Sequence, residues 1–349
     1  MRSTRYLLIC VLALTALTQV EGRKRKKENS DSETTTEIQG YRDENNVSDS
    51  VLIGSFNLKQ FGAKKANSEE ILKVIAKIVS RYDLIALQEI TDVKEKAIKT
   101  LMQAISYESE HPYHYIISTR VGRTKQKEQY ALVFRPEVFQ VKNHFVFNDA
   151  EGDIFSREPQ IAEVTLKGNG AKFAIINIHV APRNASTEID ALVDVHSWVE
   201  NRLNLKNIII IGDLNAGCDY IRKKDRANIR LITNTQKYKW LIPDSQDTTV
   251  GTTKCSYDRI IISGPYVEKN WLHGTAVPFE FDTVFGLEKK SALNVSDHYP
   301  VEFRLRLDDQ SSSNAQTTES SASVITTNKL TTFYGVAWVI CDLLATVVL

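Results

Sequence analysis

The chain has 349 residues, which is enough for one large domain or two ordinary ones. Its hydrophobic fraction of 42% is that of a globular protein. The formal net charge is only +1, so no strong overall field attracts nucleic acid. This argues against a tight, static DNA binder but not against an enzyme that releases its substrate.

The N-terminal residues have the pattern of a secretory signal peptide. Two arginines precede an apolar run from Tyr6 to Leu17, and we expect residues 1–22 to be the signal peptide. The run is short for a membrane span, and a retained membrane anchor is the alternative. Residues 23–50 are polar and are predicted to be disordered. Their basic start, Arg23–Lys27, fits a solvated tail better than a processing site or a phosphate-binding arm.

The C-terminal residues carry a second targeting pattern. Residues 308–332 are rich in Ser and Thr and read as a stalk, and residues 333–349 are apolar except for Asp342. Small residues, a polar spacer and an apolar tail predict a glycosylphosphatidylinositol (GPI) anchor, with Ser320 and Ser321 among the candidate attachment residues. A retained transmembrane span is the weaker alternative, because no Lys or Arg follows the tail.

Cysteine usage agrees with secretion. After removal of both terminal segments, Cys218 and Cys255 remain as an even pair in an oxidising compartment, so a disulfide is expected. Metal binding by these two thiols is the weaker interpretation, since no other Cys or His lies beside them at ligand spacing. Three sequons predict N-glycosylation, at Asn46, Asn184 and Asn294.

Residues 51–307 read as one folded unit without an internal repeat or linker. Strands are expected at Val51–Asn57, Leu84–Glu89, Tyr113–Thr119, Tyr130–Arg135, Val141–Phe147, Gln160–Leu166, Phe173–His179, Ile208–Ile211, Tyr257–Ser263 and Val301–Leu307. Helices are expected after an N-cap at Ser68, at Val93–Ile105 and at Glu188–Leu203. Many strands with interspersed helices predict an α/β fold in which two sheets pack face to face with helices outside.

One stretch organises the rest of the chain. The four isoleucines Ile208–Ile211 predict a strand that is buried on both faces. The run stops at Gly212, and the polar residues Asp213 and Asn215 follow. Because side chains alternate along an extended chain, the side chains of Asp213 and Asn215 are predicted to face the same side. A plain turn is the alternative, because Gly-Asp and Asn-Ala are ordinary turn dipeptides.

The same arrangement recurs where other predicted strands end or begin. The polar residues at these points are Asn57, Gln88-Glu89, His179 and Asp297-His298. Each could be a strand edge that meets water, and a lone histidine is more often structural. Together they offer carboxylates, carboxamides and imidazoles that a sandwich could bring to one rim.

Such a set fits metal-assisted hydrolysis of a phosphodiester. Mg²⁺ prefers oxygen ligands, and Glu89 is the leading candidate, with Asn57, Asp213 and Asp297 near. Two histidines that titrate near neutrality suit the transfer of protons from water and to a leaving alkoxide. The amides of Asn57 and Asn215 suit the charge that grows on a phosphoryl oxygen.

These residues stand in motifs that resemble the deoxyribonuclease I family, within the larger endonuclease/exonuclease/phosphatase group. The resemblance covers about residues 51–307. The motifs are Ser55-Phe56-Asn57-Leu58, Arg81-Tyr82-Asp83 with Gln88-Glu89, Phe155-Ser156-Arg157-Glu158-Pro159, Gly212-Asp213-Leu214-Asn215-Ala216 with Cys218, Cys255-Ser256-Tyr257-Asp258-Arg259, and Ser296-Asp297-His298-Tyr299-Pro300.

The resemblance implies a four-layer α-β-β-α sandwich and a monomeric endonuclease that cleaves double-stranded DNA with little sequence specificity. It implies dependence on Mg²⁺ and Ca²⁺ and products with 5′-phosphate ends. By position, His179 and His298 are the acid/base pair, and which is acid and which is base stays open. Glu128 would support the first histidine and Asp258 the second, and Asp213 with Asn215 would complete the catalytic set.

Other roles follow by position in the same way. The magnesium site would include Glu89, Asn57 and Asp297. Structural calcium would lie at Asp247 with Thr249 and near Asp153. DNA contacts that bind the backbone without reading its sequence would come from Arg157, Tyr257, Thr253 and Arg123.

The sequence also departs from the family pattern. Gln126 stands where members often have a groove-stacking tyrosine, and Thr91 stands where they have an arginine. Groove contacts are therefore expected to be built differently, through Arg123, Lys125 and Lys127. Actin inhibition, which some members show, is doubtful, because hydrophobic contact positions look altered, with Gln160 at one of them.

We therefore predict a DNA endonuclease that is secreted or tethered to the cell surface. Two alternatives remain. One is another phosphodiesterase of the larger group, such as a sphingomyelinase or a phosphoinositide phosphatase, which gains from the membrane tail. The other is a catalytically silent surface module, which is disfavoured because both histidines and their acidic partners are present.

Overall fold

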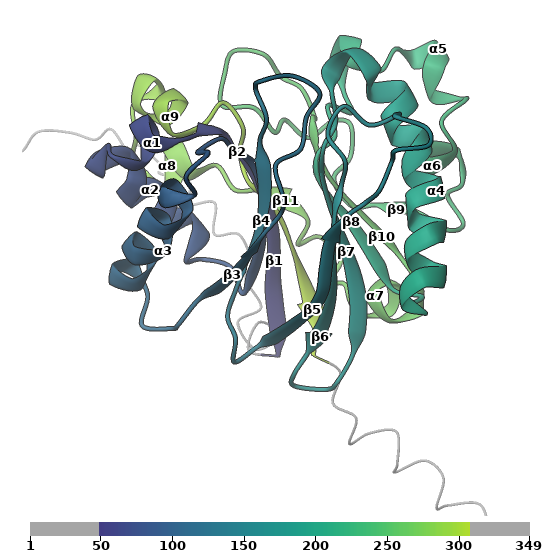
Figure 1. Ribbon diagram of the computed structural model, residues 1–349, viewed down its shortest axis with the longest axis horizontal. Helices are drawn as coiled ribbons and strands as arrows, with labels where there is room; N and C mark the ends of the chain where they lie inside the picture. The colour runs from purple at the N-terminus through teal and green to yellow at the C-terminus, as the bar shows by residue number, and fades with distance from the viewer. Residues whose placement is uncertain (1–48, 308–349) are drawn as a thin grey trace, which may run out of the picture. The chain divides into compact units, whose positions relative to one another are not determined.

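The computed structural model describes residues 49–307 as two packed six-stranded mixed sheets with helices on their outer faces (Figure 1). The first sheet has the order β11 (Val277–Pro278), β12 (Val301–Arg306), β1 (Ser50–Phe61), β2 (Leu84–Ile90), β4 (Gln129–Phe134) and β3 (His114–Ile117). The second has the order β5 (Phe139–Val146), β6 (Gln160–Leu166), β7 (Lys172–His179), β8 (Ile208–Asp213), β10 (Asp258–Ser263) and β9 (Lys239–Trp240). The predicted α-β-β-α sandwich is confirmed.

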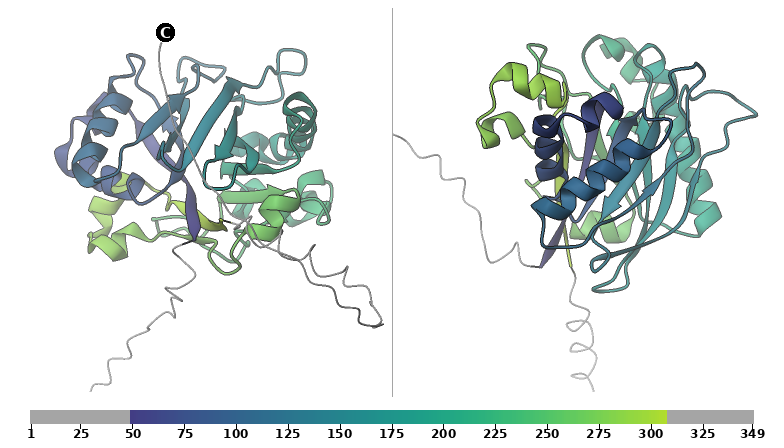
Figure 2. Two further views of the ribbon diagram at one scale, coloured as in Figure 1. Left: turned by 90° about the horizontal axis from the view of Figure 1, so that it is seen from below. Right: turned by 60° about the vertical axis from the view of Figure 1, so that its left-hand side comes forward.

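Two groups of helices form the outer layers, as two further views also show (Figure 2). The first sheet is covered by α1 (Ala63–Ala66), α2 (Glu69–Val79), α3 (Lys96–Glu108), α8 (Phe281–Phe285) and α9 (Lys289–Val295). The second is flanked by α4 (Ala185–Leu203), α5 (Lys223–Arg226) and α6 (Arg230–Thr233). The short helix α7 (Pro265–Asn270) lies against β10 and β12.

Alternation along the strands divides the apolar side chains between layers. Ile209 and Ile211 pack between the two sheets, whereas Ile208 and Ile210 pack outward against α4. All four are essentially inaccessible to solvent, so the predicted burial on both faces is confirmed. Such alternation also decides which strand residues can point into the seam between the sheets.

Each sheet contains one parallel pair of strands, β1 with β2 and β7 with β8, and its other pairs are antiparallel. In the second sheet, Asp213 is in register with both His179 and Asp258. The three side chains therefore lie in a row across neighbouring strands.

Several element boundaries differ from those predicted. Helix α3 begins at Lys96 rather than Val93, because the Asp92 carboxylate accepts the backbone N–H groups of Lys96 and Ala97. Ser68 does occupy the N-cap of α2, but its side chain makes no capping hydrogen bond. The elements that were not predicted are short, so they display too little periodicity to be recognised: α1, α5, α6, α7, α8, α9, β9 and β11.

The disulfide between Cys218 and Cys255 is present, with Cα atoms 5.8 Å apart, so the predicted pairing is confirmed. It joins the short 3₁₀ helix Cys218–Tyr220 to the loop before β10. The predicted signal peptide, stalk, apolar tail and Asn46 sequon lie outside the described residues, as does nearly all of the polar segment 23–50. No helix within residues 49–307 has the length and apolar character needed to cross a bilayer.

Candidate active site

The polar residues gather where rows of inward-facing side chains end. Asn57 continues the row of Val51 and Ile53 in β1, and His179 continues the row of Phe173 and Ile175 in β7. Each row is apolar between the sheets and polar at its end. The sequence therefore builds a polar rim on a packed apolar layer, which is a rigid support for a site.

The first histidine is anchored on one side by a carboxylate. Nδ1 of His179 lies 2.9 and 3.2 Å from the two carboxylate oxygens of Glu128, and Nε2 lies 3.5 Å from Oδ2 of Asp213. Burial alone would lower the pKa of His179, but the Glu128 carboxylate, aided by Asp213, raises it above 6.5. The anchored Nδ1 leaves Nε2 directed at Asp213.

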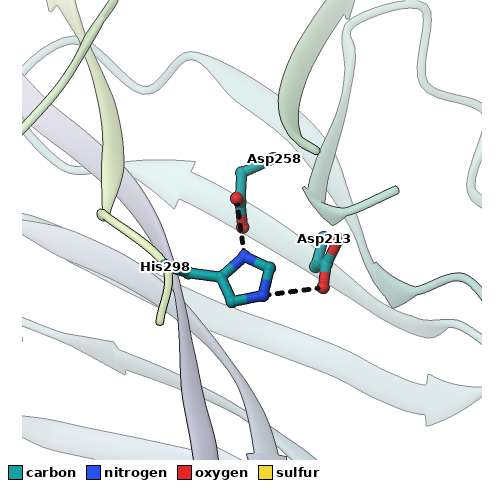
Figure 3. Close-up of side chains that lie close together, drawn as sticks. All are labelled: Asp213, Asp258 and His298. Atoms are coloured by element: carbon teal, nitrogen blue, oxygen red, sulfur yellow. Dashed lines mark hydrogen bonds and ion pairs between the residues drawn. The ribbon is translucent and has the colours of Figure 1, made fainter. Parts of the chain in front are cut away.

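The second histidine is held in the same manner (Figure 3). Nδ1 of His298 lies 2.8 Å from Oδ2 of Asp258, and Nε2 lies 3.6 Å from Oδ2 of Asp213. Although burial opposes the charge, Asp258 and Asp213 raise the pKa of His298 to about 10. The fully buried Thr248 hydroxyl donates to the same Asp258 oxygen at 2.8 Å. The role of Thr248 was not predicted from the sequence. The only sequence feature that pointed to it was its position just before Thr249, a predicted calcium ligand.

Asp213 is the centre of the arrangement. Its Oδ2 faces both Nε2 atoms and also accepts an amide N–H from Asn57 at 3.0 Å. Burial favours the neutral acid, but His298 and His179 lower the pKa of Asp213 below 3.8. The backbone N–H of Asn215 donates to Oδ1 at 3.0 Å. Asn215 has positive φ, and its side-chain amide donates to the carbonyl of Val180 at 2.9 Å.

Glu89 reaches the site through an unusual backbone conformation. It lies out of phase with the inward-facing Gln88, but its φ of +59° interrupts the extended alternation. Oε1 accepts an N–H from Asn57 at 3.0 Å, and Oε2 accepts the backbone N–H of Gln60 at 2.8 Å. Asn57 thus links the Glu89 and Asp213 carboxylates. The ligating atoms of Asp213, Asp258 and His298 all lie within 4.8 Å of one another, so the site has donors that could hold a metal ion.

Both histidine–carboxylate pairs join the two sheets. Glu128 precedes β4 in the first sheet, and its partner His179 ends β7 in the second. Conversely, His298 precedes β12 in the first sheet, and its partner Asp258 begins β10 in the second. The site is therefore assembled from both sheets at the seam.

Two of the predicted DNA contacts border this site. Nε of Arg157 donates to the carbonyl of His179 at 3.0 Å and lies 3.2 Å from Glu128, while its buried Nη2 has no partner among the described residues. The Tyr257 ring lies 6.3 Å from the His298 ring and 5.2 Å from that of Tyr220, measured between centroids.

The remaining predicted residues lie in other contacts. Arg123 pairs with Asp153, with Nε 3.1 Å from Oδ1, and both side chains are exposed. Asp297 is half-exposed and lies 3.8 Å from the ammonium of Lys59.

The loop predicted to bind calcium closes on itself. Asp247 accepts the hydroxyl and the backbone N–H of Thr249, and that hydroxyl also contacts the carbonyl of Thr253. Thr249 forms an isolated β-bridge with His298, so the loop adjoins the site through its backbone.

A cavity of about 430 Å³ opens beside His179 and Glu89. Its wall includes Thr91 and Gln126, the two residues at which the sequence departs from the family pattern. It also includes Lys125 and Lys127, which were predicted to contribute groove contacts. Arg157 also lines it. A wall with basic side chains next to His179 suits an anionic backbone.

A buried polar bridge lies beneath the rim and was not predicted. Nε2 of Gln88 donates to Oδ1 of Asn177 at 2.7 Å, and Nδ2 of Asn177 donates to Oε1 of Gln160 at 3.2 Å. All three side chains are buried. The sequence feature that could have indicated this bridge is a polar residue at an inward-facing position of each of three largely apolar strands. Gln160 is therefore part of the interior.

Comparison with known proteins identifies the family. Residues 54–298 match the Endonuclease/Exonuclease/phosphatase family. Deoxyribonuclease-1 of Sus scrofa is 37% identical over 262 residues, which cover 74% of this chain and 92% of the relative. Deoxyribonuclease-1 of Homo sapiens is 37% identical, covering 74% and 93%, and deoxyribonuclease gamma of Mus musculus is 40% identical, covering 72% and 83%.

Solved structures show the same fold at low identity. Truncated Caenorhabditis elegans TDP2 has a TM-score of 0.51 and 18% identity, covering 74% of this chain and 97% of its own. The human Nocturnin catalytic domain with bound sulfate has a TM-score of 0.52 and 14% identity, covering 73% and 93%. The class is therefore that of the endonuclease/exonuclease/phosphatase fold. Within that class, the chain belongs to the deoxyribonuclease I family and is a deoxyribonuclease.

Proposed function

We propose that this protein is a metal-dependent DNA endonuclease that hydrolyses phosphodiester bonds with a pair of histidines and leaves 5′-phosphate ends. One observation carries the proposal. The Nε2 atoms of His179 and His298 approach the same oxygen of Asp213 from two sheets, and each ring has a carboxylate on its Nδ1.

The geometry supports the following chemistry. A neutral imidazole takes a proton from the attacking water, whose oxygen bonds to phosphorus. The bond from phosphorus to the 3′ oxygen breaks, and the second imidazole, as imidazolium, gives its proton to that oxygen. The product ends are a 5′-phosphate and a 3′-hydroxyl. Glu128 and Asp258 hold their rings in orientation and support the positive charge.

The donor set also fits a divalent cation. Glu89 and Asp213 offer carboxylate oxygens that one residue, Asn57, links by hydrogen bonds. Hard oxygen donors of this kind suit Mg²⁺, and these residues would hold it. When bound, the cation would stabilise negative charge on the phosphoryl group. For Ca²⁺, the loop of Asp247 and Thr249 is the candidate.

Substrate contacts would be mainly with phosphates. Nη2 of Arg157 is buried beside Glu128 and His179 and has no acceptor within residues 49–307. Lys125 and Lys127 would extend the basic wall along the cavity. Contacts of this type position DNA without reading its bases, so low sequence specificity follows.

The test compares His179→Ala with His144→Ala, a replacement of an exposed histidine, in plasmid nicking with Mg²⁺ and Ca²⁺. The first variant should lose at least about 10²-fold in rate, the low end for acid/base catalysis, and keep its circular dichroism spectrum. The control should match the wild type. Full activity in His179→Ala would show that the site is misassigned, and turnover of sphingomyelin without DNA cleavage would favour another phosphodiesterase.

We further propose that the enzyme is secreted and that a lipid anchor tethers it to the cell surface. The sequence patterns at the two ends support this, and the Cys218–Cys255 disulfide fits an oxidising compartment. Phosphatidylinositol-specific phospholipase C should release nuclease activity from intact cells. Activity that stays with the cells after this treatment would exclude the anchor, and activity in untreated medium would indicate a soluble secreted form.

A further inference from the structure

A strained backbone segment follows Asn57 and includes Gln60, and both of these residues donate hydrogen bonds to the Glu89 carboxylate. Lys59 and Gln60 have φ of 48° and 52°, in the left-handed region that residues other than glycine seldom adopt. The register between β1 and β2 shifts between Asn57 and Phe61 at the same place. A conformation of this kind persists only where surrounding groups hold it.

Lys65 holds this segment. From α1, its Nζ donates to the carbonyl of Leu58 at 2.7 Å and to that of Lys59 at 2.9 Å. Burial, with the nearby Lys59 ammonium, lowers the pKa of Lys65 to about 8. The ammonium therefore lies where its charge is disfavoured, and its two backbone acceptors satisfy it there.

The segment in turn fixes the carboxylate of Glu89. The backbone N–H of Gln60, within the strained segment, donates to Oε2 at 2.8 Å. Asn57, immediately before it, donates to Oε1 at 3.0 Å. A shift of residues 58–60 would therefore displace both groups that orient Glu89, and with them the link from Asn57 to Asp213.

We propose that Lys65 is a positioning residue of the active site, which fixes the segment Leu58–Gln60 and through it the carboxylate of Glu89. Its hydrogen bonds go to the backbone, so it acts on the cation site through Asn57 and Glu89. The inference rests on the proposed function, because it gives Glu89 the task of binding a divalent cation.

The experiment compares K65M with K64M, which alters the exposed lysine next to it in α1. Mn²⁺ binding is measured by electron paramagnetic resonance without DNA, and plasmid nicking is measured across a Mg²⁺ titration. In K65M, Mn²⁺ affinity should fall by about 10- to 100-fold, as for other groups that orient a metal ligand. The kcat should fall by about 100-fold, as for a small misplacement of a catalytic group. K64M should match the wild type, and K65R, which keeps a positive charge and N–H donors, should recover part of the loss.

Equal Mn²⁺ affinity and kcat in K65M and K64M would overturn the inference. If K65M does not fold, K65R and K65Q test the inference instead. Mn²⁺ affinity should then be highest in the wild type, lower in K65R and lowest in K65Q. Equal affinities in the three proteins would overturn the inference. The metal measurement also separates two failures. A wild type that binds Mn²⁺ but does not cut DNA refutes the proposed function, while the comparison of variants still tests Lys65.

Discussion

A buried imidazole far from the rim should make this fold sensitive to acid. His196 lies on the inner face of α4 and is fully buried, with its ring 5.1 Å from the Tyr238 ring. Neither ring nitrogen has a hydrogen-bond partner in the described part of the chain, and Oε2 of Glu200 is 3.8 Å from Nδ1. Burial, with the charge of Lys237, lowers the pKa of His196 from 6.5 to about 4.

The sign and size of the effect follow from this difference. The unfolded chain protonates His196 near pH 6.5, whereas the folded chain does so only near pH 4. The free energy of unfolding is therefore unaffected well above pH 6.5, decreases as the pH falls through this range, and levels off below about pH 4. Between pH 7 and pH 5 the loss is about 2 kcal/mol, and the complete loss is about 3 kcal/mol.

Urea unfolding at pH 7 and pH 5 measures this loss. The variant His196→Leu removes the titrating group, and His144→Leu makes the same change at an exposed position. The wild type and His144→Leu should each lose about 2 kcal/mol more than His196→Leu between the two pH values. Other titrating groups are common to all three proteins and cancel. Equal losses in all three would refute the reasoning.

Two further substitutions test the rim and the seam beneath it. Asp258 is the main reason that the pKa of His298 is raised from 6.5 to about 10, and Asp258→Asn removes it. In the wild type, protonated His298 therefore stabilises the folded state fully below pH 6.5, and this contribution is lost as the pH rises through 10. In urea unfolding the variant should lose less stability than wild type between pH 7 and pH 9.5; an equal loss would contradict this. Asn177→Leu leaves buried Gln88 without its 2.7 Å acceptor and should cost about 1–3 kcal/mol, seen as a lower melting temperature; an unchanged one would contradict it.

The sequence predicted the framework of the site because strand alternation is a local property. The isoleucines Ile208–Ile211 are buried on both faces, and the polar residues after them had to lie at a strand end. The disulfide followed from counting cysteines in an oxidising compartment. The resemblance named both histidines and both carboxylates, and the structure brings them to one rim.

Other features depend on contacts between distant segments or on backbone conformation. Nothing in the residue pattern indicates the left-handed φ of Glu89, which turns its carboxylate out of the strand alternation toward Asn57. Thr248 and Lys65 act through a carboxylate and two carbonyls that only the folded chain brings near them. Residue type alone predicts none of these contacts.

The division of the site between two sheets has a physical consequence. Each histidine and its carboxylate come from opposite sheets, and so do Asn57 and Asp213. The spacing of the sheets therefore sets the spacing of the two imidazoles, and that spacing is maintained by side chains packed in the seam. Because close-packed interiors transmit small displacements, a change of volume between the sheets should alter catalysis as well as stability. A similar change beneath the outer helices, such as at His196, should alter stability alone.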